Sequence, residues 1–421
     1  MSYFKKIFHN DFIANTIFGL FTKAVSFAVP YLIVTPYLVR VLGEGQFGLI
    51  SFSTSFVSLF FPIAEYGFML TAPRSLSLYQ NNLYEVGKII SNVVLAKVLL
   101  GFCSFTIVLF LIFFEKRLSE NITLHFFSLL LLWGQVLMPS WAYQGLGVLK
   151  KFVGYTLILN ITYVLFITIF IRSPKDFLYV NLGQALIAIA VYLVALGNIV
   201  FPIQKYLNFS LKGAFEEIRN GFFFFLTNLL HFVFITANIV ILGFFVSGKQ
   251  LDNYSYAEKI YMIFRIVSGI IYQMAYPKVF LLKEHSPKAA NDFLIKLFFA
   301  ILLIFVIVSS VLFWQAEFII KLFTGKQNVE AAELLKILSF SSLIYALSVP
   351  VSQKILVFYS SKIFTLILFL VVLFNIGVNL YTVPLYGAKG TATTLLLTEA
   401  FFLILSTIYV LIANNLEKKN G

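Results

Sequence analysis

Long apolar runs separated by short polar connections extend along the whole sequence. A helix needs roughly 20 residues to cross a hydrocarbon layer about 30 Å thick. The runs are continuously apolar and do not alternate apolar with polar residues, so transmembrane helices are favoured over barrel strands. The pattern predicts an all-α polytopic membrane protein with twelve transmembrane helices. The twelve runs cover residues 12–39, 47–70, 89–114, 122–143, 152–171, 177–201, 221–246, 254–276, 293–314, 334–358, 363–383 and 391–413.

The composition excludes a water-soluble protein. Of the 421 residues, 60% are hydrophobic and only 12% are charged, and a soluble fold has too little interior to bury that much apolar surface. A cytosolic enzyme, a secreted domain and a nucleic-acid-binding protein are therefore excluded. The net charge of +13 is typical of a polyanion binder, but in a membrane protein it first indicates basic cytoplasmic loops. The single cysteine excludes an intramolecular disulfide.

The distribution of Lys and Arg predicts the orientation of the chain in the membrane. Most basic residues outside the apolar runs fall on the side of the N-terminus, among them the pairs at 5–6, 150–151 and 418–419. Basic loops stay on the cytoplasmic side, so both termini are predicted to be cytoplasmic. The first run is too long for a secretory signal and lacks a small-residue cleavage site, which favours a retained helix.

The longest polar connection lies in the middle of the chain. It divides the sequence into an N-terminal lobe of six helices at 1–201, a cytoplasmic linker at 202–220 and a C-terminal lobe of six helices at 221–421. Helices two and eight end in similar triplets, Ala72-Pro73-Arg74 and Tyr276-Pro277-Lys278, which suggests a parallel internal repeat.

Several charged residues lie inside the apolar runs, where each costs a few kcal/mol and is a functional candidate. The bases in question are Lys23, Lys97, Lys259 and Arg265, and the acids are Glu65, Glu258 and Glu399. Lys296 and Lys336 lie about one turn from a helix start, so their ammonium groups are expected to reach the interface, and Lys97 has the same alternative. Glu399 has no partner in its own helix and either pairs with a basic residue elsewhere or stays protonated.

Uncharged polar residues mark further helix faces. Asn228, His231 and Asn238 recur at helical spacing in helix seven, and Tyr272 and Tyr276 in helix eight offer rings that suit sugars. A membrane histidine is often an interhelical hydrogen-bond partner, which is the alternative for His231. Together with the buried charges, these faces predict a central cavity of net positive charge that accepts a phosphate or pyrophosphate group. Its carboxylates could bind and release H⁺ or Na⁺ during a transport cycle.

The motifs of several other functions are absent. The sequence has no Gly-rich phosphate loop followed by Lys and Ser or Thr, which argues against ATP hydrolysis, and its four histidines are scattered without metal-ligand spacing. No cofactor or metal is therefore predicted. The loops are also too short for the extramembrane catalytic site of a polymerase or ligase, so the protein is predicted not to be an enzyme.

Ordered motifs along most of the chain resemble the Wzx-type polysaccharide flippases. They are 40–48 (RVLGEGQFG), 65–68 (EYGF), 72–75 (APRS), 254–260 (YSYAEKI), 275–278 (AYPK) and 386–390 (YGAKG). The resemblance implies membership of the multidrug/oligosaccharidyl-lipid/polysaccharide exporter superfamily and a MATE-like fold of two six-helix lobes around a central cavity. Where such proteins often carry Arg after the proline of helix eight, this chain has Lys278.

The resemblance also implies a function. It is the transfer of undecaprenyl-pyrophosphate-linked oligosaccharide repeat units, for O-antigen or a similar surface polysaccharide, from the cytoplasmic to the periplasmic leaflet of a bacterial inner membrane. Alternating access coupled to H⁺ or Na⁺ is expected, with membrane lipids, a polysaccharide polymerase and a chain-length regulator as further partners and no nucleic acid. The alternatives are a cation-coupled multidrug exporter of the same superfamily and a membrane polymerase or ligase.

Twelve residues are predicted to act in this transport. Those expected to contact substrate are Lys23, Lys97, Arg265, Lys259, Tyr272, Asn228 and His231. Those expected to couple ions or to gate are Glu65, Glu258, Glu399, Arg74 and Lys278.

Overall fold

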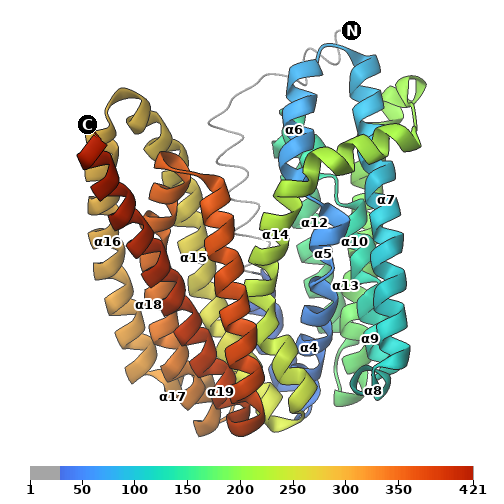
Figure 1. Ribbon diagram of the computed structural model, residues 1–421. Coiled ribbons are helices and arrows are strands. Elements are labelled where there is room, and N and C mark those ends of the chain that lie inside the picture. The colour runs from blue at the N-terminus through green and yellow to red at the C-terminus, as the bar shows by residue number, and fades with distance from the viewer. Residues whose placement is uncertain (1–28, 421) are drawn as a thin grey trace. The chain divides into compact units, whose positions relative to one another are not determined.

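The computed structural model describes residues 29–420 and the side chains up to residue 416, and this part of the chain is helical without a strand (Figure 1). The predicted all-α class is confirmed. Nine segments of the described chain are long and apolar enough to cross a membrane. They do not correspond one-to-one to the twelve predicted helices for three reasons. Most of the first run lies outside the described residues, and one segment with a kink, Ser361–Leu416, covers two runs. The helix Lys249–His285, which contains the run at 254–276, is not among the nine.

The chain forms two compact units. The first comprises the described residues up to Leu42 together with Ile50–Phe232, and the second comprises Gly43–Leu49 and the residues from Val233 onward. The boundary at Phe232 falls inside one long helix, α14 (Leu211–Phe245), whose charged first turns precede the apolar run predicted for helix seven.

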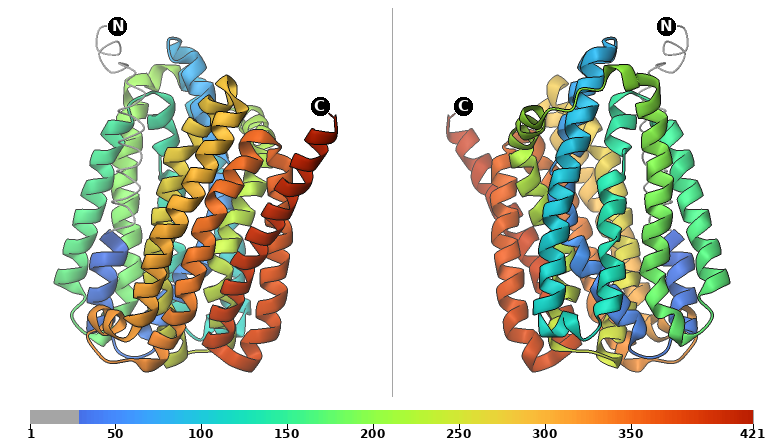
Figure 2. Two further views of the ribbon diagram at one scale, coloured as in Figure 1. Left: turned by 90° about the vertical axis from the view of Figure 1, so that its left-hand side faces the viewer. Right: turned by 90° about the vertical axis from the view of Figure 1, so that its right-hand side faces the viewer.

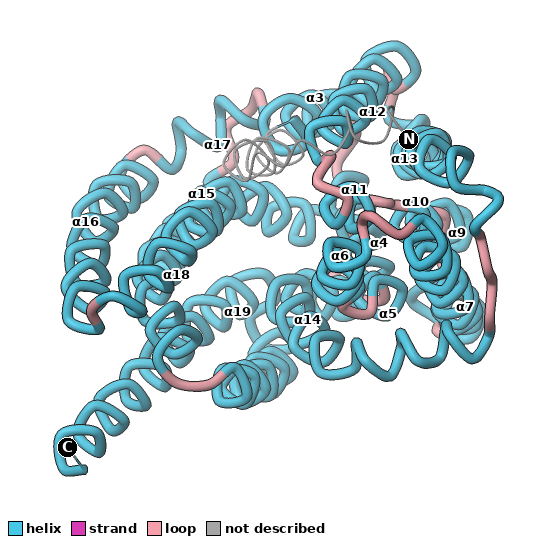
Figure 3. The backbone as a smooth tube through the Cα atoms, turned by 90° about the horizontal axis from the view of Figure 1, so that it is seen from above, coloured by secondary structure: helices cyan, strands magenta, loops and turns pink. Residues whose placement is uncertain are grey.

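The first unit contains most of the shorter helices. They are η1 (Val29–Val34), α3 (Thr35–Val41), α4 (Gln46–Ser58), α5 (Phe61–Glu65), α6 (Phe68–Tyr79), α7 (Leu83–Phe114), α8 (Lys116–Ser119), α9 (Ile122–Leu129), α10 (Leu131–Leu137), α11 (Ser140–Gly145), α12 (Leu149–Phe170), η2 (Pro174–Phe177), α13 (Leu178–Val200) and η3 (Phe201–Tyr206). In the view along the helix axes, α9 and α10 lie between α7 and α13 (Figure 3).

The second predicted helix is interrupted. Its residues form α4, α5 and α6, and between the last two Tyr66 and Gly67 adopt left-handed backbone conformations with φ of 45° and 83°. The Tyr66 ring stacks on Phe225 of α14 with ring centroids 4.4 Å apart, and a Cβ on Gly67 would lie 2.7 Å from the Cβ of Phe224. A left-handed tyrosine is sterically costly, so this contact with α14 helps to hold the interruption in place.

The linker segment before α14 is attached to α7. The Asn208 N–H donates to the Ser91 hydroxyl at 3.0 Å, and the Ser210 N–H donates to Asn92 Oδ1 at 3.2 Å. Buried side chains of α6, α7, α11 and α13, such as Leu76, Ile90 and Trp141, form a hydrophobic core in this unit.

The second unit is built from long helices. They are the end of α14, α15 (Lys249–His285), α16 (Pro287–Trp314), α17 (Ala316–Thr324), α18 (Val329–Phe358) and α19 (Ser361–Asn420). Helix α18 packs against α15, α16 and α19, and Figures 2 and 3 show these helices side by side. The α19 helix is kinked at Gly387, where φ is 55°, at the place where the apolar pattern predicts a turn between two helices.

Residues Gly43–Leu49 belong to the second unit because they dock on the start of α15. The buried carboxylate of Asp252 accepts hydrogen bonds from the N–H groups of Gly45 and Gly48, both at 2.5 Å. Phe47 contacts Tyr256 with ring centroids 5.6 Å apart. Part of the motif at 40–48 is therefore a backbone docking segment, and its glycines allow the close approach.

Candidate functional site

Arg265 of α15 and Glu399 of α19 form a buried ion pair in the second unit. Their side chains are 5% and 0% exposed. Arg265 Nη1 donates to Glu399 Oε1 and, at 2.7 Å, to the Tyr261 hydroxyl, which itself donates to Glu399 Oε1 at 2.9 Å. Of the two alternatives for Glu399, the structure thus shows pairing with a base 134 positions away.

Aromatic rings enclose the guanidinium group. Its Cζ lies 4.0 Å from the ring centroid of Tyr345 on α18 and 4.8 Å from that of Phe234 on α14. Ring faces attract a cation, and the attraction is stronger where water is excluded. The Arg265 charge is therefore stabilised by an acid, a hydroxyl and two rings, which together connect four helices.

The pair retains unused hydrogen-bonding capacity. Within the described chain, Arg265 Nε and Nη2 and Glu399 Oε2 are buried without a hydrogen-bond partner. Buried polar atoms are nearly always satisfied, so such exceptions often mark places where a ligand or water binds. The unused donors suit an anion, and the unused carboxylate oxygen suits a proton or a cation.

A cluster of neutral amides lies in the same unit. Asn238 Oδ1 of α14 accepts from Asn375 Nδ2 at 3.1 Å and from Asn379 Nδ2 at 2.9 Å. Asn375 Nδ2 also donates to the hydroxyl of Thr398, the residue before Glu399, at 3.0 Å. These side chains are fully buried, and their hydrogen bonds join α14 to the parts of α19 before and after its kink.

In the first unit, Lys97 of α7 is buried and its ammonium group caps the C-terminal end of α10. Its Nζ donates to the carbonyl oxygens of Gln135 at 3.1 Å and Met138 at 3.0 Å, where α10 ends before Pro139. The side chain of Gln135 in turn donates from Nε2 to Glu65 Oε2 at 3.2 Å. A cation at a helix C-terminus satisfies carbonyls that have no partner inside the helix.

This geometry predicts a stabilising role for Lys97. Replacing Lys97 by Met keeps the length of the chain but leaves two carbonyl groups without their donor, at a cost of about 1–3 kcal/mol. We expect a lower midpoint of thermal unfolding in detergent, whereas Lys88→Met on the exposed face of the same helix should leave it unchanged. A Lys97→Met protein that unfolds at the wild-type temperature but has lost transport would instead indicate direct substrate contact.

The remaining predicted residues form smaller groups. Glu258 and Lys259, which are adjacent on α15, form an ion pair at 3.1 Å. Tyr272 and Tyr276 are half-buried and their rings stack with centroids 6.0 Å apart. Asn228 is half-buried, and Arg74, His231 and Lys278 are exposed. Lys23 lies outside the described residues.

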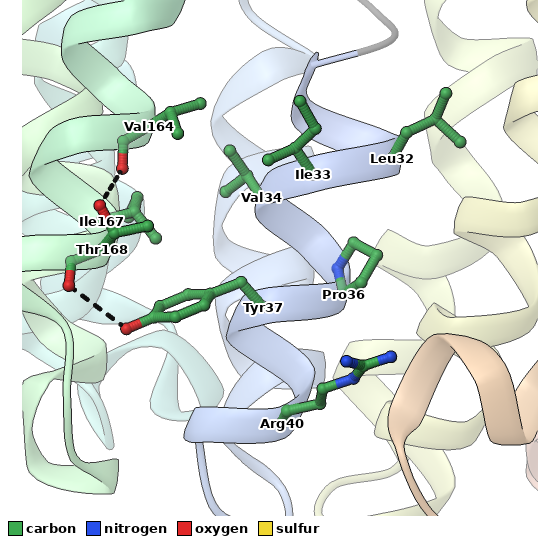
Figure 4. A pocket seen from close by; sticks show the side chains of 9 residues that line it. All are labelled: Leu32, Ile33, Val34, Pro36, Tyr37, Arg40, Val164, Ile167 and Thr168. Carbon is green, nitrogen blue, oxygen red and sulfur yellow. Dashed lines mark hydrogen bonds between the residues drawn. The ribbon is translucent and has the colours of Figure 1, made fainter.

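One pocket of about 330 Å³ lies in the first unit between the η1–α3 segment and α12 (Figure 4). Its lining is mostly apolar, with Tyr37, Arg40 and Thr168 as the polar side chains, and the Tyr37 hydroxyl donates to the Ile171 carbonyl at 2.9 Å. None of the eleven predicted residues that the structure describes lines it.

Several contributors to the site were not predicted from the sequence. Phe234, Tyr261 and Tyr345 are residue types that are common in membrane helices, so nothing in their local sequence distinguishes them. Gln135 is an uncharged polar residue within an apolar run, and its sequence gives no sign of its partner Glu65. A weak signal existed for Tyr261, which lies one helical turn before Arg265 and therefore on the same face.

Comparison with known proteins identifies the family. Residues 8–282 match the model of a family described as polysaccharide biosynthesis protein. The chain belongs to this family. The match includes Glu65, Lys97 and Arg265 and ends before Glu399. The resemblance predicted from the sequence motifs is thereby confirmed at the level of the family.

Two curated relatives agree with this assignment along nearly the whole of both chains. The chain is 25% identical over 402 residues to a "Putative O-antigen transporter" of Shigella dysenteriae, covering 93% of this chain and 98% of the relative. A protein of the same description in Escherichia coli strain K12 is 22% identical, with 95% and 96% covered.

Two solved structures show the fold. An inward-facing MATE-family multidrug transporter of the MOP superfamily matches with a TM-score of 0.72 at 13% identity, covering 95% of this chain and 99% of that one. The lipid II flippase MurJ in an inward closed conformation matches with a TM-score of 0.68 at 16% identity, covering 94% and 87%. The predicted MATE-like fold is confirmed, and the count of twelve helices stays a prediction.

Proposed function

We propose that the protein is a flippase that moves undecaprenyl-pyrophosphate-linked oligosaccharide repeat units of O-antigen or a similar surface polysaccharide across a bacterial inner membrane. The observation that carries the proposal is the match to O-antigen transporter relatives along nearly the whole of both chains. The family match and the MurJ-like fold support it. The direction is from the cytoplasmic to the periplasmic leaflet, with both termini in the cytoplasm, and the protein acts as a transporter and not as an enzyme.

The Arg265–Glu399 pair is the proposed centre of the transport cycle. In the paired state the guanidinium charge is neutralised by Glu399 and shielded by rings. A pyrophosphate that reached the unused Nε and Nη2 atoms would offer Arg265 a second anionic partner. The loosened Glu399 would then gain a proton or a cation, because an unpaired carboxylate is costly in a buried site. Substrate binding and ion binding would thus be coupled through one salt bridge.

The other predicted residues have supporting roles in this proposal. Polar side chains such as Asn228 and Tyr272 would contact the sugars, and the polyprenyl chain would stay in lipid. Lys97 and Glu65 would maintain the interrupted helix in the first unit through Gln135. Lys23 and Lys259 stay candidates for contact with the substrate. Glu258, Arg74 and Lys278 stay candidates for ion coupling or gating.

Deletion of the gene in its own bacterium tests the function. We expect loss of surface polysaccharide and accumulation of the lipid-linked repeat unit on the cytoplasmic leaflet, both reversed by a plasmid copy of the wild-type gene. Unchanged surface polysaccharide would contradict the proposal. If deletion instead increased sensitivity to cationic drugs while polysaccharide stayed normal, the multidrug exporter would be the better assignment.

A further inference from the structure

Two lysine side chains converge on one phenylalanine at an end of the second unit. The ammonium groups of Lys283 on α15 and Lys354 on α18 lie 5.1 Å and 5.9 Å from the ring centroid of Phe358. This end holds the α15–α16 turn and the C-terminal part of α19 (Figure 1), and it corresponds to the predicted cytoplasmic side. Both lysines are half-buried, so their positions are more restricted than those of lysines in open solvent.

Neighbouring groups fix both ammonium groups. Lys283 Nζ donates to the Val357 carbonyl at 2.7 Å, and Lys354 Nζ donates to Asn291 Oδ1 at 2.7 Å. Each ammonium has three donors, and the neutral Val357 carbonyl leaves the positive charge of Lys283 in place. Phe358 and the buried Val357 belong to the small hydrophobic cluster that joins α15, α16 and α18.

The surroundings of the two lysines are basic overall. Lys278 lies on α15 with its ammonium 4.6 Å from the Phe293 ring of the same hydrophobic cluster, and Lys288 is exposed in the first turn of α16. Two exposed acids, Glu284 and Asp292, are also present. Within the described chain, neither Lys278 nor Lys283 forms an ion pair with an acid.

Exposed apolar side chains lie on two of the helices that carry the basic cluster, α15 and α16. Phe280 and Leu281 on α15 are 46% and 57% exposed, and Ile295 and Phe299 on α16 are 48% and 61% exposed. Exposed apolar side chains of this kind face lipid tails in a membrane protein. A ligand that matches both surfaces has an anionic head with more than one negative charge and a long hydrocarbon chain.

We propose that Lys283 and Lys354, with Lys278 beside them, form a site that receives the pyrophosphate of the polyprenyl-linked substrate at the cytoplasmic leaflet. The inference rests on the proposed function and adds a first binding site to it. Two ammonium groups 5.1 Å and 5.9 Å from the centre of one ring concentrate positive charge that suits the multiple negative charges of a diphosphate, and the apolar faces of α15 and α16 hold the first part of the polyprenyl chain.

Binding measurements on the full-length protein in phosphatidylcholine nanodiscs test the site. The probes are undecaprenyl pyrophosphate and, for ordinary anionic lipid, phosphatidylglycerol. We expect the double variant Lys283→Gln/Lys354→Gln to bind undecaprenyl pyrophosphate about tenfold more weakly, which corresponds to roughly 1.4 kcal/mol, and to bind phosphatidylglycerol as the wild type does. Lys283→Arg/Lys354→Arg keeps both charges and should retain binding.

The matched control is Lys321→Gln/Lys326→Gln, which removes the same charge from two exposed positions in and after α17. It should leave both affinities unchanged. Equal loss of phosphatidylglycerol binding in the Lys283/Lys354 variant, or undiminished binding of undecaprenyl pyrophosphate, would overturn the inference alone. Wild-type protein that fails to bind undecaprenyl pyrophosphate would overturn the proposed function as well.

Discussion

Replacing Glu399 by Gln is expected to abolish transport and to destabilise the protein by about 3–5 kcal/mol, because it leaves the Arg265 charge buried without its counterion. Arg265→Gln should be equally severe, because it leaves the Glu399 carboxylate buried without its counterion. The measurement is thermal or denaturant unfolding of the purified protein in detergent, combined with surface polysaccharide in a deletion strain that expresses each variant. Glu333→Gln, which removes an acid from the exposed ion pair with Lys389, serves as the control and should cost less than about 1 kcal/mol.

The double variant Arg265→Gln/Glu399→Gln separates a structural role from a functional one. Removing both charges together leaves no uncompensated ion, so much of the lost stability should return. Transport should stay absent, because neither the anion-binding donors nor the titratable carboxylate remains. A double variant that regains both stability and transport would show that the pair only holds α15 and α19 together.

Gly48→Ala is expected to disrupt the docking of residues Gly43–Leu49 on α15. A Cβ at this position would lie 2.6 Å from the backbone nitrogen of Asp252 and 2.7 Å from the carbonyl carbon of Leu251. Backbone atoms of a packed helix cannot move aside cheaply, so the segment must shift and the two N–H bonds to the Asp252 carboxylate are lost. We expect a destabilisation of about 2–4 kcal/mol, since a buried carboxylate then loses its donors.

Gly377→Ala is the matched substitution for this test, because a Cβ there meets no atom within 4 Å. It should be neutral or slightly stabilising, as alanine is the better helix former. The test compares the thermal unfolding midpoints of both variants with that of the wild type in the same detergent. Similar midpoints for Gly48→Ala and the wild type would mean that the docked segment contributes little to the fold.

Helices that are apolar along their whole length could be predicted from the sequence. The run at 152–171 corresponds to α12. The run at 293–314 lies within α16, which begins about two turns earlier at Pro287 and is capped by Ser286. Hydrophobicity marks the part of a helix that is in lipid, so it omits polar turns at helix ends such as the first turns of α14 and the last turns of α15.

Interruptions within apolar runs could not be predicted in the same way. The run at 122–143 contains α9, α10 and the start of α11, and the run at 47–70 is broken at Tyr66 and Gly67. These breaks depend on partners from distant parts of the chain. Phe225 stacks on Tyr66, and Lys97 satisfies the carbonyls at the end of α10.

Charged residues of the candidate site were found from the sequence, but their partners were not. Arg265 and Glu399 are conspicuous because each is a charge within an apolar run. Their pairing depends on how α15 packs against α19, which no local pattern encodes. Lys97 donates to backbone carbonyls, and such partners carry no residue-type signature. Asp252 lies just before the predicted helix, where a carboxylate is unremarkable, so its docking role became visible only in the structure.

Transport by the purified protein in proteoliposomes tests the central claim most directly. Undecaprenyl-pyrophosphate-linked oligosaccharide is placed in the bilayer, and its appearance in the opposite leaflet is followed with a sugar-modifying enzyme added to one side. We predict transfer by the wild-type protein and none by the folded Arg265→Gln/Glu399→Gln variant. A wild-type protein that leaves the lipid in its original leaflet, or a neutral double variant that transfers it at the wild-type rate, would contradict the account.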